Sequence, residues 1–555
     1  MAAPALLAFN LPPSATFFNQ AAALVGWGGF LVVVADAAPL HRRFGNSGLM
    51  ALLAALALLL ASSLASPLWA GLPSALALSG AGLILAAALA ALVGASVQSA
   101  GFGVTAFRAL CIGMVVAGVA SSVVGIVQVF APQWPDGDFI ARTYIAGRAV
   151  GNMRQPNHLS SLLVWATIAA VWLAETGVLK RWVGAALALL FIFVIVLSAS
   201  RTGTVSVGLL AVWSLLDKRL SRPTRLLLLF APLAYGVFWF GTSAWADYSH
   251  HVFGGETRFS TKGDISSSRW GIWSNTLALI AMHPWAGVGF GEFNFAWTLT
   301  PFPGRPVAFF DHTHNIILQF AVELGLPLAT AVLALLGWAL FSAWRGAQDS
   351  ARRAALVMVL MILLHSLLEY PLWYAYFLLP AAFAFGLCLG RPEDAPAAVA
   401  SGKTTRPLLI ASLLLMLGGI ASVADYSRVV TIFAPAEGAP PLAQRIASGR
   451  RSVFFAHQAD YAAATTTEHP ADAMDAFQRA PHNLLDARLM IAWAKALDES
   501  GDHERARYVA QRLEEFHNEQ AAEFFAPCAE PPQPGVPPPF QCEPPSRSFG
   551  YEDFR

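Results

Sequence analysis

Long runs of apolar residues recur along this chain, and they constrain its fold more than any other feature. A helix needs about 20 mostly apolar residues to cross the hydrocarbon core of a bilayer. The predicted spans lie at residues 19–38, 48–68, 77–95, 109–130, 158–176, 183–199, 203–216, 225–242, 314–343, 354–368, 372–390 and 407–425. Charged residues make up only 12% of the chain, about half their share in soluble domains. The sequence therefore predicts an all-α polytopic membrane protein with about twelve transmembrane helices.

Basic residues in the short loops indicate how the predicted spans are oriented. Loops rich in lysine and arginine lie on the cytoplasmic side of a membrane. Such loops contain, among others, Arg222, Arg345, Arg352, Arg353 and Arg391. The opposite short loops contain almost no basic residues, and Arg201 is the exception. The outer side is therefore predicted to hold residues 131–157, the long loop 243–313 and the region from 426 onward. The N-terminus is predicted there too, although residues 1–11 read equally as the remnant of a further span.

The character of the sequence changes near residue 426, where charged residues become frequent and apolar residues become periodic. Residues 1–425 are predicted to form a transmembrane domain that includes loop 243–313, and residues 426–555 a helical domain outside the cytoplasm. Residues 486–517 are expected to form two helices around Ser500–Asp502, similar to one tetratricopeptide unit. The residues expected to pack between them are Ala492, Ala494, Leu497, Ala506, Val509 and Leu513.

The end of the chain is rich in proline, which excludes a continuous helix over residues 527–545. Cys528 and Cys542 bracket this segment. Outside the cytoplasm the environment permits disulfides, so a Cys528–Cys542 bond is predicted. The alternative is two free thiols in a disordered end.

A polar segment at the start of the ninth predicted span is the most informative motif. Asn315, Gln319 and Glu323 follow one another at intervals of four and would form one polar stripe on a helix. Ionisable residues inside a membrane usually face a bundle interior or a wet cavity, although a structural hydrogen-bond stripe is the alternative. His314 lies at the predicted water boundary, and histidine is the residue type whose ordinary charge change falls near neutral pH. It is therefore the candidate base that accepts a proton from an attacking hydroxyl.

Two arginines on the predicted outer side are candidate phosphate ligands. Arg201 lies in a tight turn between two spans, and Arg269 lies in a segment expected to form an amphipathic helix on the outer membrane surface. A guanidinium group matches phosphate oxygens in a bidentate fork. Two such groups suit a lipid diphosphate whose tail stays in the bilayer. The alternative is ordinary snorkelling of both side chains to the headgroups.

Two further outer segments carry candidate substrate contacts. Residues 151–158 combine glycine and proline with Arg154, Gln155 and Asn157, which offer donors and acceptors to sugar hydroxyls. A helix-capping turn is the alternative there. Tyr370 lies in an aromatic turn between two spans, where ordinary interfacial anchors are equally expected. Asn315 completes the set of predicted substrate-binding residues, and no metal site is predicted.

In their order and predicted membrane sides, these segments resemble the O-antigen ligase/polymerase superfamily. Within it the chain is most similar to the bacterial protein O-oligosaccharyltransferases, the pilin glycosylation ligases of the PglL type. The resemblance rests on residues 155–157, 200–203, 269–270, 312–315, 323–325 and 369–374. It extends from about Thr16 to the C-terminus, and family members usually begin with one more complete span.

The resemblance implies a GT-C-like ligase fold in the bacterial inner membrane. It implies transfer of a whole glycan from undecaprenyl diphosphate to Ser or Thr of exported proteins such as pilin, in the periplasm, with inversion and without metal or other cofactor. By motif, His314 matches the essential histidine, and Arg201 and Arg269 match the diphosphate-binding arginines. Gln155 and Tyr370 match residues important in the protein-glycosylating branch.

Two alternatives share this donor chemistry. One is an O-antigen ligase with lipid A-core as the acceptor, and the other is an O-antigen polymerase that joins repeat units. The 155–157 loop and the external C-terminal region favour a protein acceptor. A lipid-linked glycan transporter is the alternative from another class. Transporters often contain internal repeats, and the sequence contains no evident repeat.

Overall fold

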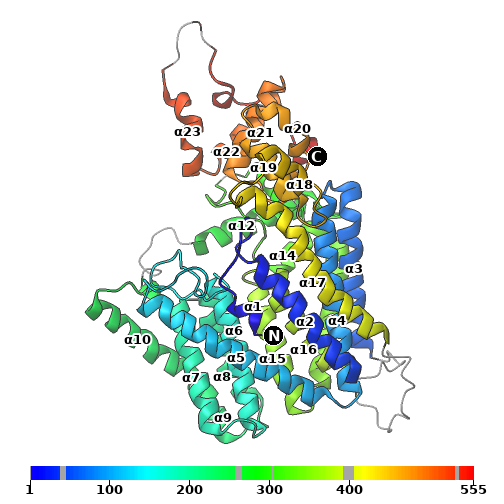
Figure 1. The fold of residues 1–555 in the computed structure, drawn as a ribbon, viewed down its shortest axis with the longest axis vertical. Coiled ribbons are helices and arrows are strands. Elements are labelled where there is room, and N and C mark those ends of the chain that lie inside the picture. Colours follow the sequence, from blue (N-terminus) through cyan, green and yellow to red (C-terminus); the bar gives the residue numbers. More distant parts are fainter. Residues whose placement is uncertain are drawn as a thin grey trace. The chain divides into compact units, whose positions relative to one another are not determined.

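The structure is a computed structural model that describes residues 2–37, 46–256, 265–302, 304–391, 406–531, 535 and 537–555. Within these residues every regular element is a helix (Figure 1), so the all-α prediction is confirmed for this part of the chain. The α-helices up to residue 433 are α1 (Ala3–Leu6), α2 (Phe17–Ala37), α3 (Ser47–Trp69), α4 (Ser74–Ser99), α5 (Gly103–Phe130), α6 (Pro156–Glu175), α7 (Arg181–Ser198), α8 (Arg201–Leu216), α9 (Arg222–Leu229), α10 (Ala231–Ser249), α12 (Ile265–Met282), α13 (Phe293–Leu299), α14 (Ile316–Gly346), α15 (Ser350–Ser366), α16 (Ala375–Leu389) and α17 (Arg406–Phe433).

The remaining elements are shorter. The α-helices are α18 (Leu442–Gly449), α19 (Ala456–Thr466), α20 (Met474–Phe477), α21 (Ala487–Glu499), α22 (His503–Glu514) and α23 (Ala522–Phe525). The 3₁₀ turns are η1 (Pro371–Trp373), η2 (Pro470–Ala473), η3 (Ala480–His482), η4 (Glu519–Ala521), η5 (Ala526–Ala529), η6 (Phe540–Cys542) and η7 (Tyr551–Phe554).

Each of the predicted spans coincides with a helix, except the span 225–242, which covers parts of α9 and α10. Among the described residues, eight helices are long and apolar enough to cross a membrane: α2, α3, α4, α5, α6, α7, α14 and α17. Helices α9 and α10 pass the same test together but are bent by 42°. Helices α8, α15 and α16 are shorter. The chain is thus a multi-pass membrane protein, while the count of twelve crossings stays a prediction.

The described chain divides into two compact units. The first comprises Met1–Ala54, Leu85–Lys262 and Leu335–Val423. In it α6 is buried along almost its whole length. Small residues allow close helix packing: a side chain added at Gly118 would meet Ala166 of α6 and Phe191 of α7. Helix α6 is therefore packed closely against α5 and α7 at this point.

The second unit comprises Ala55–Ile84, Gly263–Ala334 and Ala424–Arg555. The predicted helix pair of the C-terminal region is present as α21 and α22, with Asp486 and Asp502 as N-caps. Five of the six residues expected to pack between these helices are buried, and Ala492 is half-buried. The predicted domain boundary near residue 425 concerns placement relative to a membrane and remains a prediction.

The end of the chain is folded onto the C-terminal helices. Cys528 and Cys542 are joined by a disulfide, with their Cα atoms 5.2 Å apart. Beyond the disulfide, Phe554 is buried and packs on Tyr508 of α22 and Trp493 of α21. In the described part of the proline-rich tail the regular elements are short 3₁₀ turns, as its composition requires.

Candidate active site

A buried polar network lies at the start of α8, in the first unit. The Ser200 hydroxyl caps this helix by accepting from the Gly203 amide over 3.0 Å, and it donates to Asn157 Oδ1 over 2.6 Å. Asn157 in turn donates through Nδ2 to Glu369 Oε1 over 3.0 Å. All three side chains are less than one-tenth exposed. The network fixes the backbone from which Arg201 projects.

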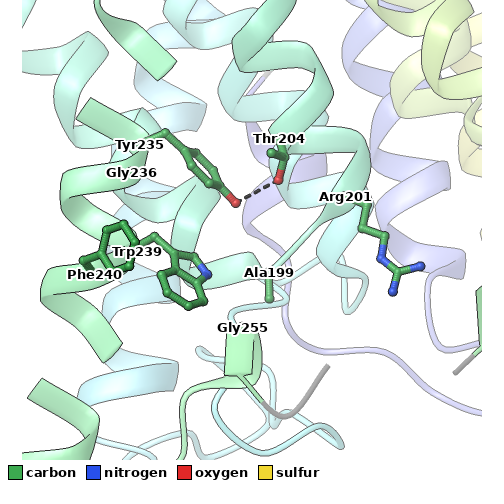
Figure 2. A pocket seen from close by; sticks show the side chains of 8 residues that line it. All are labelled: Ala199, Arg201, Thr204, Tyr235, Gly236, Trp239, Phe240 and Gly255. Carbon is green, nitrogen blue, oxygen red and sulfur yellow. Dashed lines mark hydrogen bonds between the residues drawn. The ribbon is translucent and has the colours of Figure 1, made fainter. Parts of the chain in front are cut away.

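Arg201 is the first residue of α8, and it lies at the edge of a cavity of about 360 Å³ (Figure 2). The cavity is lined by Ala199, Arg201, Thr204, Tyr235, Gly236, Trp239, Phe240 and Gly255. Tyr235 of α10 and Thr204 of α8 are hydrogen-bonded over 2.8 Å. The rings of Trp239 and Phe240 lie to one side, and the Arg201 guanidinium points away from them. The N-terminus of a helix favours anions, so the start of α8 and the Arg201 guanidinium together suit an anion. The wall of the cavity on the other side is apolar.

Arg154 and Gln155, two of the predicted sugar-binding residues, lie immediately before α6. Some of their hydrogen-bonding groups are used in contacts within the protein. Gln155 is the N-cap of α6, because its side chain accepts from the His158 amide over 2.8 Å. Arg154 has a left-handed φ of 57° and donates to the Ala15 carbonyl over 2.7 Å. Tyr370 is half-buried and stacks on Tyr374 with ring centroids 6.1 Å apart. Gln155 therefore caps α6, as the alternative interpretation expected. Its side-chain NH₂ group is not used by this capping bond.

The predicted base lies in a strained turn of the second unit. His314 has a φ of 55°, which few residues other than glycine adopt, and such strain clusters at functional sites. Its ring packs edge-on against Phe310, with centroids 5.3 Å apart. Asn315 accepts from the amides of Ile317 and Leu318 and so caps α14. The imidazole is half-buried.

The polar stripe predicted on α14 is present. Gln319 donates to Glu323 Oε1 over 2.9 Å, and its own oxygen accepts from the Thr313 amide over 2.8 Å. The stripe therefore holds the segment immediately before His314. Gly325 breaks the helix with a φ of 74°, and a Cβ there would lie 2.3 Å from the Trp285 carbonyl oxygen. Only glycine fits this close approach.

Helix α12 brings Arg269 to the same segment. Trp273 donates through Nε1 to the Thr313 carbonyl over 2.9 Å. Residues four apart share a helix face, so Arg269 lies on the face of α12 that contacts the His314 turn. In α12, Asn275 is buried and Trp270 is exposed. One face of α12 packs against the second unit, and its placement on the outer membrane surface stays a prediction.

The C-terminal region supports the loop that leads to His314. Asn294 donates to the Phe310 carbonyl over 2.8 Å and accepts from the Leu485 amide over 2.7 Å. Glu292 and His482 form a buried pair 2.8 Å apart. Burial raises the pKa of Glu292, and the hydrogen bond from His482 opposes this effect.

A buried arginine makes the second connection between this loop and the C-terminal region. Arg305 pairs with Glu515 over 2.9 Å and lies over the ring of Phe516. Burial lowers the pKa of Arg305 to about 10, although Glu515 opposes this. Arg305 thus stabilises the packing of this loop. It is buried by Glu515 and Phe516, which lie more than two hundred positions away in the sequence.

The structure groups the predicted site residues into two sets. Arg154, Gln155, Asn157, Arg201 and Tyr370 belong to the first unit, and Arg269, His314 and Asn315 to the second. Ser200 and Trp273 position members of these sets, a role that the sequence analysis assigned to neither residue. Serine before a helix was the available signal for Ser200, whereas nothing local indicates the partner of Trp273.

Three families of known proteins match parts of this chain. A family described as O-Antigen ligase matches residues 186–333, which contain Arg201, Arg269 and His314. A family described as Protein glycosylation ligase matches residues 149–174, and the C-terminal part of a virulence factor membrane-bound polymerase family matches 353–528. These matches confirm the resemblance to the O-antigen ligase superfamily.

Two relatives from Acinetobacter baylyi are similar to this O-antigen ligase-like chain. One is a General O-oligosaccharyltransferase, 29% identical over 280 residues that cover 48% of each chain. The other is a ComP-specific O-oligosaccharyltransferase, 24% identical over 259 residues that cover 45% of each chain. The chain thus spans about half the length of the curated relatives it matches.

Proposed function

We propose that this protein is a glycosyltransferase that moves a whole glycan from undecaprenyl diphosphate to Ser or Thr of exported proteins such as pilin. The observation that carries the proposal is its similarity to two O-oligosaccharyltransferases. The reaction takes place on the periplasmic side of the bacterial inner membrane. The acceptor hydroxyl displaces the diphosphate directly, and the anomeric configuration inverts.

The surroundings of Arg201 support a lipid diphosphate as the donor. A guanidinium at a helix N-terminus binds phosphate oxygens through a fork of N–H groups and through the helix dipole. Across the cavity from this guanidinium, Trp239 and Phe240 provide an apolar wall for the first isoprene units. When the sugar–phosphate bond breaks, charge grows on the leaving diphosphate, and fixed donors stabilise it best. The buried Asn157–Ser200 hydrogen bond keeps Arg201 in place for this task.

The surroundings of His314 support its role as the base. The strained turn holds the imidazole against Phe310. On one side of His314 the Thr313 amide donates to Gln319 Oε1, and on the other side the Asn315 amide donates to the Thr313 hydroxyl. A base held in one position lowers the entropic cost of reaching the attack geometry. Arg269 projects from the face of α12 bonded to this turn, and we assign it to the diphosphate as a second cation.

A second candidate function is O-antigen ligation or polymerisation, which the two longer family matches favour. Donor, base and arginines are the same in either case, and only the acceptor differs. The match of residues 149–174 to a protein glycosylation ligase family favours the protein acceptor. Gln155 and Tyr370 are the residues of this set assigned to acceptor or glycan contact.

Co-expression in a host that makes a lipid-linked glycan, together with a candidate pilin, tests the function. Intact-mass analysis of the pilin should show an added glycan on Ser or Thr. The Arg222→Ala variant, altered outside both residue sets, serves as an expression-matched control. Glycan found on lipid A-core instead of pilin would establish the ligase alternative. An unmodified pilin and unmodified lipid A, despite donor synthesis, would refute both.

The predicted placement has a separate test. An alkaline phosphatase fused after residue 555 should be active, because the enzyme folds only in an oxidising compartment. A fusion after Gly346, at the end of α14, should be inactive. The opposite pattern would overturn the orientation derived from the basic loops.

A further inference from the structure

A second cavity, of about 430 Å³, lies in the first unit where several helices end. Its walls come from the start of α3, the ends of α14 and α16, and the first turn of α15. It is lined by Asn46, Ser47, Trp338, Phe341, Ser342, Arg345, Gly346, Arg352, Cys388, Gly390 and Arg391. Cavities of a few hundred cubic ångströms are large enough for small ligands or headgroups.

The walls of this cavity are held together by hydrogen bonds. Trp338 of α14 donates through Nε1 to the hydroxyl of Ser47, the first residue of α3, over 3.2 Å. Asn46 donates to the Leu389 carbonyl at the end of α16. The Cys388 thiol donates to the Arg352 carbonyl over 3.3 Å. The cavity is thus a defined feature of four packed helix ends.

The charge in the cavity is positive. Arg352 is paired with Asp349, with Nε and Oδ2 2.6 Å apart, so its charge is offset. Arg345 and Arg391 are exposed, and neither forms an ion pair within the described part of the chain. Arg345 lies over the ring of Phe341 at 5.8 Å, which leaves its N–H groups available at the edge. Two arginines with a third nearby suit an anion.

The remaining wall is aromatic. Trp338 and Phe341 line the cavity and are each about half exposed, and their rings lie 5.8 Å apart. Trp344 continues this surface along α14, with its ring 5.9 Å from that of Phe341. A free inorganic anion would gain no binding energy from contact with this aromatic wall. A lipid places its phosphate on the arginines and its acyl chains along the aromatic face.

We propose that this cavity binds the phosphate group of an anionic phospholipid. Helix α14 is apolar enough to span a membrane and carries Arg345 in its last turn, next to one of the basic loops. By the basic-loop rule this is the cytoplasmic side, where anionic lipids attract basic clusters. The site is independent of the proposed glycan transfer, because no residue of either predicted set lines it.

Native mass spectrometry of the purified full-length protein tests the site. The protein is titrated with phosphatidylglycerol and with phosphatidylcholine in the same detergent. Wild-type protein should retain phosphatidylglycerol preferentially. Removing one arginine, in Arg345→Ala or Arg391→Ala, should weaken its retention about fivefold, and removing both about 30-fold. The double Lys variant should keep part of the affinity because it keeps both charges.

Matched controls separate this site from general charge effects and from a free anion. Arg222→Ala removes an exposed arginine on the same predicted side, outside the cavity, and should leave retention unchanged. Unchanged retention in the double Ala variant would overturn the proposal. Inorganic phosphate at millimolar concentration should not displace the lipid. Full displacement by phosphate would assign the arginines to a free anion and overturn the lipid proposal.

Discussion

Asn157 donates its side-chain amide to Glu369 across 212 residues of sequence, and the two buried side chains join the start of α6 to the turn before α16. The other side of Asn157 accepts from Ser200, the cap of α8. One amide thus connects three of the segments that carry the family resemblance. A carboxylate removed from water has to be hydrogen-bonded, and Asn157 provides this partner. We infer that Glu369 positions Arg201 through Asn157 and Ser200.

This relay predicts a graded response at Glu369. Glu369→Gln keeps an oxygen that accepts from Asn157, and it should lower stability and glycan transfer only slightly. Glu369→Ala leaves the buried amide without this acceptor and should cost about 1–3 kcal/mol of unfolding free energy. Thermal unfolding in detergent and pilin glycosylation measure the two effects. Equal losses in Gln and Ala variants would show that the carboxyl group acts in another way.

Arg201 and Arg269 are predicted to hold the diphosphate. Alanine at either position should lower transfer about 10²–10³-fold, the range seen when one fixed donor to a developing charge is removed. Lysine should restore only part of the activity, because it lacks the planar fork. The rate of pilin modification at matched expression measures this. Full activity in both Ala variants would exclude the role, and Arg222→Ala controls for loss of surface charge.

Local signals account for what the sequence predicted well. Apolar runs long enough to span a bilayer fall on the helices, and periodic alanines and leucines with Asp486 and Asp502 as caps define α21 and α22. Helical period and capping depend on residues a few positions apart. The polar stripe from Asn315 to Glu323 follows the same local rule and is present on α14.

Features that depend on distant residues were not predictable. Arg305 is buried because Glu515 and Phe516 cover it, and no local pattern indicates that pairing. The left-handed backbone at Ala199 is equally hidden, since alanine rarely adopts a positive φ.

The raised pKa of Glu292 predicts how stability changes with pH. Because burial raises this pKa, the contribution to stability is complete below the ordinary pKa of about 4.3 and is lost as pH rises through the raised value. Glu292→Gln still accepts from His482 but does not titrate. Wild-type stability should therefore fall relative to Glu292→Gln as pH rises from about 4 toward neutrality. Thermal unfolding of both proteins across this range measures the difference.

The control for this prediction is Glu437→Gln, which removes an exposed carboxyl group of the same unit. Its stability should follow the wild-type pH profile. His482 and Arg555 are the charged groups that face Glu292, and both are retained in the two variants. Parallel wild-type and Glu292→Gln profiles would contradict the assignment of this pH dependence to Glu292.

The Cys528–Cys542 disulfide predicts both a chemical and an energetic result. Peptide mapping without reduction should recover the two cysteines as one linked pair. The double Ser variant should lose up to about 3 kcal/mol of unfolding free energy, the chain-entropy value for closing a loop of about 15 residues. Buried Cys111 and Cys388 serve as internal references, because they carry free thiols. Alkylation of Cys528 and Cys542 without prior reduction would show that the two cysteines are not joined by a disulfide.

His314 is predicted to take the proton of the acceptor hydroxyl as its oxygen bonds to the anomeric carbon. The carbon–oxygen bond to the diphosphate breaks in the same step, so the configuration inverts. Removing such a base should cost about 10²–10⁴-fold in transfer. His314→Asn separates chemistry from folding, because asparagine tolerates the left-handed backbone but is no base at neutral pH. It should unfold at the wild-type temperature yet transfer little glycan, and His312→Ala should be milder. Wild-type transfer by His314→Asn, or a product that keeps the donor's anomeric configuration by nuclear magnetic resonance, would exclude this mechanism.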